Sequence, residues 1–513
     1  MALNRSRQRN RTTSLIAVVS IVGVLAIGAG VGGAATRVES ATPTSLVIAD
    51  AIEPGNLDVQ LTSTAVVNEA LYNVYDALTQ FNRNVKATPA LAVSWKNLTP
   101  TTWKFVLRKG VKFQNGEPFT PASAVFSITR AVVPTSMNLA YYSLLKGATV
   151  IKGQNAILLE TTAPDPNIPA ELTFLPMVPP KYVTTQFDEY LKHPVGTGPY
   201  TFDHWKRGQE LVVTRNPKWW GGKARYDKVT FRLIPDANVR VQALRAKEIN
   251  FASSIAPAQV SQVPQAFTPP SNTVCVIRLN NQSEPFNNLN IRKAANYAID
   301  RKKIVSALFG RLAAVSHAQL VGQASFGYDP KLKDYPYDPA QAKSLLTAGG
   351  YKNQPITILS PSGRWTGDRD VMLSAANYLK QAGFNISPKI VEFSVWRAGY
   401  FATPRPDAAF VCTGDDGFTG FRPLVNLATP TGPQTAYINA AIGDKIKKAQ
   451  STFDDKKRAA LMRSIWSALK TDAFAVPIAS VKQIYGAQRN IYWRTPLHGR
   501  VYANDIIIRK KNG

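Results

Sequence analysis

The segment at 103–128, with the sequence WKFVLRKGVKFQNGEPFTPASAVFSI, constrains the fold of this chain more than any other stretch. Every second side chain from Trp103 to Leu107 is large and apolar, which is the period of a half-buried strand. A second short apolar run follows and ends in Asn-Gly at 115–116, whose small residues suit a tight turn. Pro121 then stands where a helix needs no N–H, so we expect two strands, a turn and a helix in this order.

Length and composition restrict the class of protein. At 513 residues the chain is too long for one small core, and we expect two or three lobes. Hydrophobic residues make up 45% and charged residues 18%, which is typical of a soluble globular protein. Strand-like and helix-like segments alternate without a repeat, so we predict a mixed α/β fold. One helix is expected to start at Asp338-Pro339 and to end at Gly349-Gly350.

The formal net charge of +28 is unusual for a chain of this composition. Such a charge could serve to bind nucleic acid, an anionic membrane or acidic wall polymers. The lysines and arginines are spread along the chain without a dense block and without interleaved aromatics, so we expect no nucleic-acid partner. A basic envelope protein that binds anionic polymers remains an alternative.

The N-terminus has the layout of an export signal. Arginines within residues 5–11 precede an apolar segment at 14–35, which ends in small residues that offer a cleavage site. The segment is nearly long enough to span a bilayer, so residues 1–35 are either a signal peptide or an N-terminal membrane anchor. Both alternatives place the rest of the chain outside the cytoplasm.

The sequence carries no recognisable catalytic or metal-binding motif. It has four histidines and lacks HExxH, paired CxxC, GxSxG and GxxxxGK[ST] patterns. Asp415 and Asp416 are adjacent, so on a strand their carboxylates would point apart and make a poor acid–base couple. We therefore expect no enzyme activity, no metal site and no cofactor.

The two cysteines, Cys275 and Cys412, each lie in a strand-like run. In an exported protein they could form a disulfide. Two buried thiols that never meet are equally compatible with the sequence, because spacing alone does not bring the Cα atoms within bonding range. Both alternatives stay open.

Ordered motifs over most of the chain resemble those of extracytoplasmic solute-binding proteins of ABC importers, family 5, the peptide- and nickel-binding type. Besides the segment at 103–128, these are Gly-Thr-Gly-Pro-Tyr at 196–200, Arg-Asn-Pro-Lys-Trp-Trp at 215–220, Pro-Phe-Asn-Asn at 285–288, Ile-Arg-Lys-Ala to Ile-Asp-Arg at 291–301 and Tyr-Asp-Pro to Leu-Leu at 337–346. The motifs are most similar to those of dipeptide-binding members.

The resemblance implies a three-lobed fold like that of type II periplasmic binding proteins. Lobe I would be discontinuous, lobe II would be an insertion that holds the 103–128 segment, and the ligand would lie between lobes I and III, which close by a hinge. The expected boundaries are 44–66, 195–275 and 478–513 for lobe I, 67–194 for lobe II and 276–477 for lobe III.

The resemblance also implies a function. It predicts a protein that captures short peptides outside the cytoplasm and delivers them, as a monomer, to the permease subunits of an ABC importer and their ATPases. Family members also carry nickel chelates, haem, oligosaccharides and opines, so another solute remains an alternative. A lipid anchor is not expected, because no cysteine precedes Cys275.

Ligand-binding residues follow from the same resemblance. Thr413-Gly414-Asp415 matches a segment whose Asp holds the ligand's ammonium group, and Arg369 matches an Arg that holds its carboxylate, although the nearby Arg364 competes for this role. Trp396 resembles a tryptophan that lines the cleft; packing in the core is the alternative. One acid and one base at fixed separation would orient a zwitterionic peptide. The chain departs from the family at Cys412, where an aromatic residue is common, and at 417–423, which favours a longer peptide or another solute.

Overall fold

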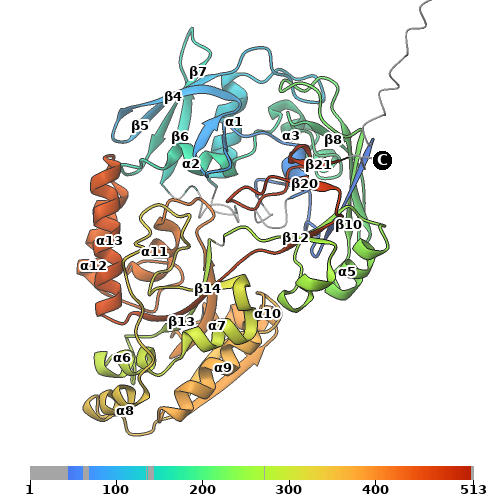
Figure 1. Cartoon of the computed structure of the whole chain (residues 1–513). Coiled ribbons are helices and arrows are strands. Elements are labelled where there is room, and N and C mark those ends of the chain that lie inside the picture. Colours follow the sequence, from blue (N-terminus) through green and yellow to red (C-terminus); the bar gives the residue numbers. More distant parts are fainter. Residues whose placement is uncertain are drawn as a thin grey trace, which may run out of the picture. The chain divides into compact units, whose positions relative to one another are not determined.

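The computed structural model describes residues 44–61, 69–133, 136, 142, 144–270 and 272–509. The predicted signal or anchor at 1–35 lies outside the described residues. In the part of the chain that is described, no helix is long and apolar enough to cross a membrane. Sheets and helices are mixed throughout Pro43–Gly513, which forms one compact unit, so the predicted α/β class is confirmed (Figure 1).

A seven-stranded sheet, counted over the described residues, combines distant stretches of sequence. The strand at Ser45–Asp50, which comes first in the sequence, pairs in parallel with both of its neighbours, and the remaining pairs are antiparallel. In spatial order the strands are β12 (Gln265–Phe267), β19 (Tyr485–Ala487), β11 (Phe251–Ala252), β1 (Ser45–Asp50), β10 (Lys228–Leu233), β9 (Glu210–Arg215) and β8 (Tyr200–Lys206). Helix α5 (Ala237–Arg245) packs against β11 and β19.

A six-stranded sheet is the second large sheet among the described residues. In spatial order its strands are β14 (Ala313–Val315), β18 (Ala475–Val481), β13 (Thr273–Leu279), β17 (Ala408–Gly414), β15 (Ile356–Pro361) and β16 (Ile386–Val391). Successive side chains of β13 point to opposite faces. Val274 and Val276 therefore join one hydrophobic core, and Cys275 and Ile277 join another.

Helices cover both faces of the six-stranded sheet, so its strands are buried on both sides. On the face of Cys275 lie α6 (Leu289–Tyr297), α7 (Arg301–Phe309), α8 (Pro339–Ala348) and α9 (Asp368–Gln381). On the other face lie α10 (Phe393–Tyr400), α11 (Phe421–Ala428), α12 (Ala440–Gln450) and α13 (Asp455–Thr471). The predicted helix start is confirmed: the Asp338 side chain caps α8, and Pro339 is its first residue.

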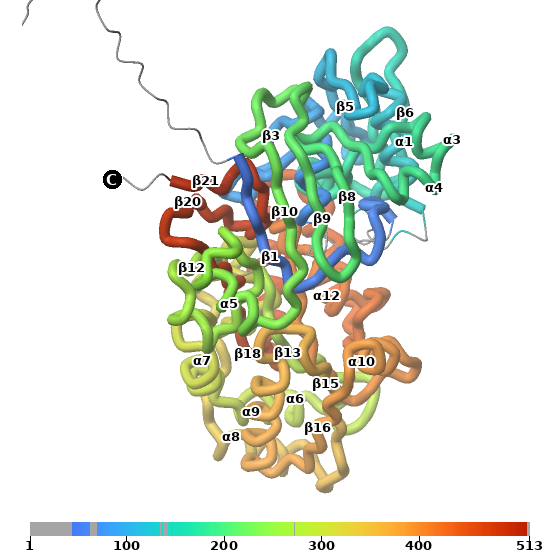
Figure 2. The backbone as a smooth tube through the Cα atoms, turned by 90° about the vertical axis from the view of Figure 1, so that its right-hand side faces the viewer, coloured from blue at the N-terminus to red at the C-terminus, as the bar shows by residue number. Residues whose placement is uncertain are grey.

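The chain crosses between the two large sheets from β12 to β13 and again from β18 to β19. The predicted lobe boundaries at 275/276 and 477/478 cut through β13 and β18. Both strands belong to the six-stranded sheet over their whole length, since each pairs with strands of that sheet. The two crossings thus lie a few residues away from these predicted boundaries. Figure 2 shows β1, β8 and β9 in its upper half and β13, β15 and β16 in its lower half.

The 103–128 segment contributes one strand, β5, to a four-stranded sheet of the described chain. The order of this sheet is β4 (Ala92–Thr99), β5 (Thr102–Leu107), β7 (Ala156–Thr161) and β6 (Leu145–Val150). Alternate side chains of β5 are buried, from Trp103 to Leu107. Gly116 takes a φ of 92° in the predicted turn, and α1 (Pro121–Ala131) begins at the predicted proline. The second strand is shorter than expected, because only Lys112 and Pro118 form a bridge there.

The remaining short elements lie near these sheets. They are β2 (Thr79–Phe81) paired with β3 (Ala87–Pro89), β20 (Ile491–Trp493) paired with β21 (Ile506–Ile508), and the helices α2 (Ile168–Glu171), α3 (Pro180–Thr185) and α4 (Phe187–Tyr190).

Candidate functional site

A cavity of about 560 Å³ is lined by residues from both large sheets. Asp50 at the end of β1 and Ser253 after β11 belong to the side of the seven-stranded sheet, and α10 belongs to the other side. The crossing from β18 to β19 also contributes, through Lys482 and Ile484. Sites for small solutes have volumes of roughly 300–1,000 Å³, so the cavity has the size of a ligand site.

An aromatic wall borders the cavity along α10. Trp396 stacks on Phe393 with ring centroids 5.5 Å apart and on Tyr400 at 4.6 Å. Trp365 meets Trp396 edge-on at 5.4 Å. Trp396 is 4% exposed, so it packs in the core and lines the cavity at once, and both alternatives considered for it hold. Its buried Nε1–H has no acceptor among the described residues, which leaves a donor available to a ligand or water.

A disulfide joins Cys275 of β13 to Cys412 of β17 and forms part of the cavity lining. The two residues are direct partners in the antiparallel register, and their Cα atoms are 3.9 Å apart. The sequence left the pairing open because 137 positions separate the cysteines. The strand register settles it, since it brings together two segments that spacing alone does not relate.

Arg364, and not the predicted Arg369, lines the cavity. The Asp368 carboxylate accepts the backbone N–H groups of Gly363, Arg364, Trp365 and Arg369 at 2.8–3.1 Å, which fixes the loop between β15 and α9. The Arg364 guanidinium lies 5.2 Å from the centre of the Phe393 ring. Arg369 is an exposed residue in the first turn of α9 and does not line the cavity.

On the side of the six-stranded sheet, Asp416 lines the cavity, whereas the predicted Asp415 is not part of the lining. Asp415 is fully buried beneath the turn that follows β17, where its Oδ2 accepts the N–H of Gly420 at 2.8 Å. Burial raises the pKa of Asp415 to about 6. Asp416 points to the cavity and forms an ion pair with Arg422. Thr413 and Gly414 line the cavity as predicted.

The sequence interpretation missed two acids on the side of the seven-stranded sheet, Asp50 and Glu69. The Ser253 hydroxyl donates to Asp50 Oδ1 at 2.8 Å. Burial raises the pKa of Asp50 to about 6, and burial together with the adjacent Asp50 raises that of Glu69 well above its ordinary value. A signal existed for Asp50, because it ends an apolar strand, where ligand sites of parallel sheets occur. Across the described residues no group of His, Cys, Asp and Glu is placed to hold a metal ion.

Comparisons with known proteins agree with this architecture. The family model of bacterial extracellular solute-binding proteins, family 5 Middle, matches residues 86–432. The nickel-binding periplasmic protein of Escherichia coli is 28% identical over 487 residues, which cover 87% of this chain and 91% of that protein. Heme-binding protein A of Haemophilus influenzae is 27% identical over 457 residues, covering 80% and 82% of the two chains.

A solved structure of a similar protein is the periplasmic binding protein DppA from Helicobacter pylori, in complex with the peptide STSA. It has a TM-score of 0.77 and 25% identity, and the alignment covers 91% of this chain and 99% of that one. The likeness confirms the predicted periplasmic-binding-protein fold. Because the family model matches more than half of the chain, the protein belongs to the bacterial extracellular solute-binding proteins of family 5.

Proposed function

We propose that this protein captures short peptides outside the cytoplasm and hands them to the permease of an ABC importer. The observation that carries the proposal is the Arg364 guanidinium, which lines the cavity and forms no ion pair within the described residues. A peptide ends in a carboxylate, and the planar fork of arginine donates two parallel hydrogen bonds to such a group. The peptide complex of DppA, a protein of the same fold, supports the choice of ligand.

The other contacts follow from the cavity lining. Thr413 and Gly414 would meet the peptide backbone, and Trp396 would pack against a side chain and offer its unpartnered Nε1–H. Arg364 would hold the peptide carboxylate in place of the predicted Arg369, while Asp416 stays paired with Arg422. Movement of the two sheet regions about the β12–β13 and β18–β19 crossings would close the site and exclude water, which strengthens each polar contact.

The proposed function also includes export, a monomeric state and partners in the membrane. Export depends on residues 1–35, the protein acts as a monomer, and its partners are the permease subunits with their ATPases. It catalyses no reaction. Heme-binding protein A and the nickel-binding periplasmic protein show by their names that relatives bind other solutes, so the ligand class is the point to test.

Native mass spectrometry of the purified protein tests the ligand class, followed by calorimetric titration with a peptide such as Ser-Thr-Ser-Ala. We expect a co-purified peptide, and Arg364→Ala should weaken binding at least tenfold, because a hydrogen-bonded charge contributes about 1.5–3 kcal/mol. Arg369→Ala is the matched control and should bind like the unchanged protein. A co-purified nickel chelate, haem or sugar, or binding only to anionic polymers that moderate salt abolishes, would overturn the proposal.

A further inference from the structure

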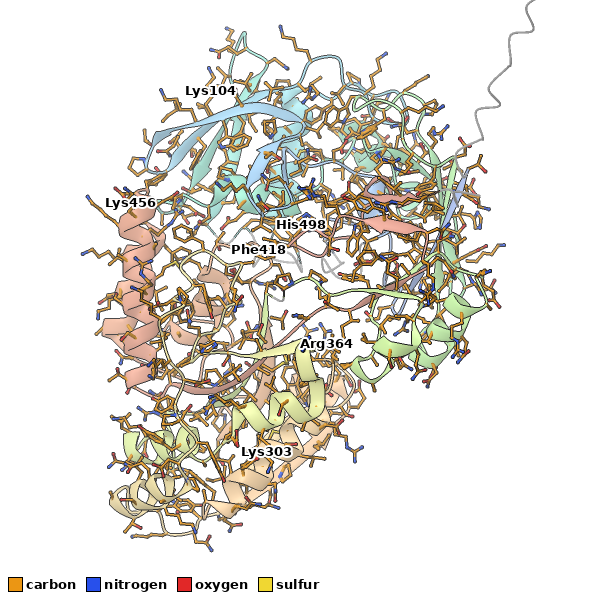
Figure 3. The ribbon with its side chains drawn as sticks, in the orientation of Figure 1. Lys104, Lys303, Arg364, Phe418, Lys456 and His498 are labelled. Carbon is orange, nitrogen blue, oxygen red and sulfur yellow. A yellow bond between two sulfur atoms is a disulfide. The ribbon has the colours of Figure 1, made fainter. Side chains whose placement is uncertain are left out.

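The cavity carries opposite charges on its two sides. On the side of the six-stranded sheet lie Arg364 and Arg397, neither of which forms an ion pair among the described residues, and the Asp416–Arg422 pair. On the side of the seven-stranded sheet lie the carboxyl groups of Asp50 and Glu69. Figure 3 shows Arg364 near the middle of the picture, between the part with the seven-stranded sheet and the part with Lys303. A ligand that bridges the sheets therefore meets cations at one end and acids at the other.

Arg278, buried behind the aromatic wall, adds positive charge to the side of the cavity that carries Arg364. Arg278 is 2% exposed, its guanidinium lies 4.0 Å from the centre of the Tyr400 ring, and it makes no ion pair with an acid in the described chain. Its Nη1–H donates to the Gln434 carbonyl at 3.0 Å, so a neutral carbonyl group and not a carboxylate stabilises its positive charge. Tyr400 and Gln434 both line the cavity, so this charge acts on the same side as Arg364.

On the acidic side the Ser253 hydroxyl donates to Asp50, but the described residues leave one oxygen of Glu69 without a donor. Glu69 Oε2 is buried and accepts no N–H or hydroxyl hydrogen from the described residues. The nearest arginine, Arg240, donates instead to the carbonyls of Ile234 and Pro235, at 2.6 and 2.8 Å, and to that of Ser254. A buried carboxylate oxygen without a donor is costly, and a ligand N–H would satisfy it.

The groups around this pair favour a cation further. Behind Asp50 and Glu69 a smaller cavity is lined by Glu53 and Glu210, which add negative charge. The charge of Arg240 acts on Asp50, and Lys482 of the crossing and Tyr485 of β19 also line the large cavity. The raised pKa values of the two carboxyl groups mean that the pair holds a proton more readily than free carboxyl groups do. A bound cation would displace this proton.

We propose that Asp50 and Glu69 bind the ammonium group of the ligand, so that a zwitterion lies across the cavity with its amine at the seven-stranded sheet and its carboxylate at Arg364. This inference rests on the proposed function and adds the orientation of the ligand. The bound amine enters as an ammonium ion, and the Asp50–Glu69 pair gives up its shared proton to the solvent. Binding is therefore accompanied by release of protons from this pair.

The test compares Ser-Thr-Ser-Ala with its N-acetylated form, which lacks the ammonium group. We expect the unchanged protein to bind the acetylated peptide at least tenfold more weakly. Asp50→Asn and Glu69→Gln should each weaken binding of the free peptide by a similar factor, without affecting that of the acetylated one. Glu160→Gln, an exposed acid on β7 that lines neither cavity, is the matched control and should behave like the unchanged protein.

Calorimetry in buffers of different ionisation enthalpy supplies a second readout. The unchanged protein should release protons when it binds the peptide near pH 7, and Glu69→Gln should release fewer. Equal binding of the free and acetylated peptides, or no proton release, would overturn the ammonium site and leave peptide capture standing. If the unchanged protein binds neither peptide, the proposed function and this inference both fail. The comparison of peptides on the unchanged protein keeps the test valid should a variant fold poorly.

Discussion

Phe418, in the turn that follows β17, packs edge-to-face against Phe81 of β2, with ring centroids 6.1 Å apart. His498 stacks on the same Phe81 ring at 6.1 Å, and Figure 3 labels both Phe418 and His498. Burial, with a smaller effect of Arg500, lowers the pKa of His498 to about 3, so this ring is neutral at physiological pH. The turn that presents Asp416 to the cavity is thus held by an aromatic cluster from other parts of the chain.

Phe418→Ala should loosen this turn. Phe418 is 5% exposed, and truncation of a buried phenylalanine costs about 3–5 kcal/mol. We expect a lower free energy of unfolding in urea and peptide affinity reduced about tenfold, because Asp416 loses its fixed position. Phe418→Leu keeps most of the apolar volume and should lose less than half as much of both. Unchanged urea midpoint and affinity in the alanine variant would show that the cluster does not hold the turn.

The disulfide makes a separate contribution to stability. Joining Cys275 to Cys412 closes a loop of 137 positions, and loops of this length restrict the unfolded chain by about 5 kcal/mol in the entropic model, with measured values of about 2–4 kcal/mol being common. Dithiothreitol should therefore shift the urea midpoint of the unchanged protein down. The double variant Cys275→Ala, Cys412→Ala should start from the lower midpoint and ignore the reductant. A reductant effect of equal size on the double variant would refute this account.

Local patterns predicted the fold elements better than they predicted the site. The alternation from Trp103 to Leu107, the Gly116 turn and the Asp338 cap were correct because each depends on residues close in sequence. The predicted lobe boundaries at 275/276 and 477/478 fall within β13 and β18, since a strand such as β18 has the same sequence pattern on either side of a crossing. Only the pairing of β18 with its neighbouring strands shows which sheet it belongs to.

Prediction from the sequence is more limited for the residues of the cavity. Motif matching selected Thr413, Gly414 and Asp415, and of these three the cavity lining contains Thr413 and Gly414 but has Asp416 in place of Asp415. Adjacent side chains point in different directions, so an offset of one residue separates a buried acid from a cavity acid. Asp50 and Glu69 were missed for another reason: neither belongs to a motif, and the fold brings them together.

Asp415 should give the protein a distinctive dependence of stability on pH. Its pKa is about 6 in the folded state against an ordinary value of 3.8, so between these pH values the folded protein binds more protons than the unfolded chain. Stability from this group is complete below about pH 4 and is lost as the pH rises through 6, by at most about 3 kcal/mol. Asp415→Asn retains an acceptor for Gly420 and removes the titration.

The urea midpoints of the two proteins at pH 4, 5, 6 and 7 measure this effect. The stability of the unchanged protein relative to Asp415→Asn should fall over this range, and the difference isolates Asp415 from Asp50, whose pKa is also raised to about 6. Asp416→Asn, at the neighbouring cavity position, serves as the control and should run parallel to the unchanged protein. A constant difference between the unchanged protein and Asp415→Asn would mean that Asp415 is ionised in the folded state throughout.

Asp368 should act on peptide binding through Arg364, although it lies outside the cavity lining. Its carboxylate holds the N–H groups of the loop that carries Arg364, and an asparagine in its place offers one acceptor oxygen where the carboxylate offers two. Asp368→Asn should therefore weaken Ser-Thr-Ser-Ala binding about tenfold by calorimetry. In an Arg364→Ala background it should have almost no further effect, since the group that it positions is gone.

A C-terminally amidated peptide separates positioning from a general loss of structure. Without a carboxylate the ligand gains little from Arg364, so Asp368→Asn should leave the affinity for the amide nearly unchanged while it lowers that for the free acid. If Asp368→Asn instead weakens both peptides equally, or adds its full effect to Arg364→Ala, then Asp368 supports the fold of this region and does not orient the arginine. The distinction matters because the loop between β15 and α9 is where the structure replaces one predicted arginine with another.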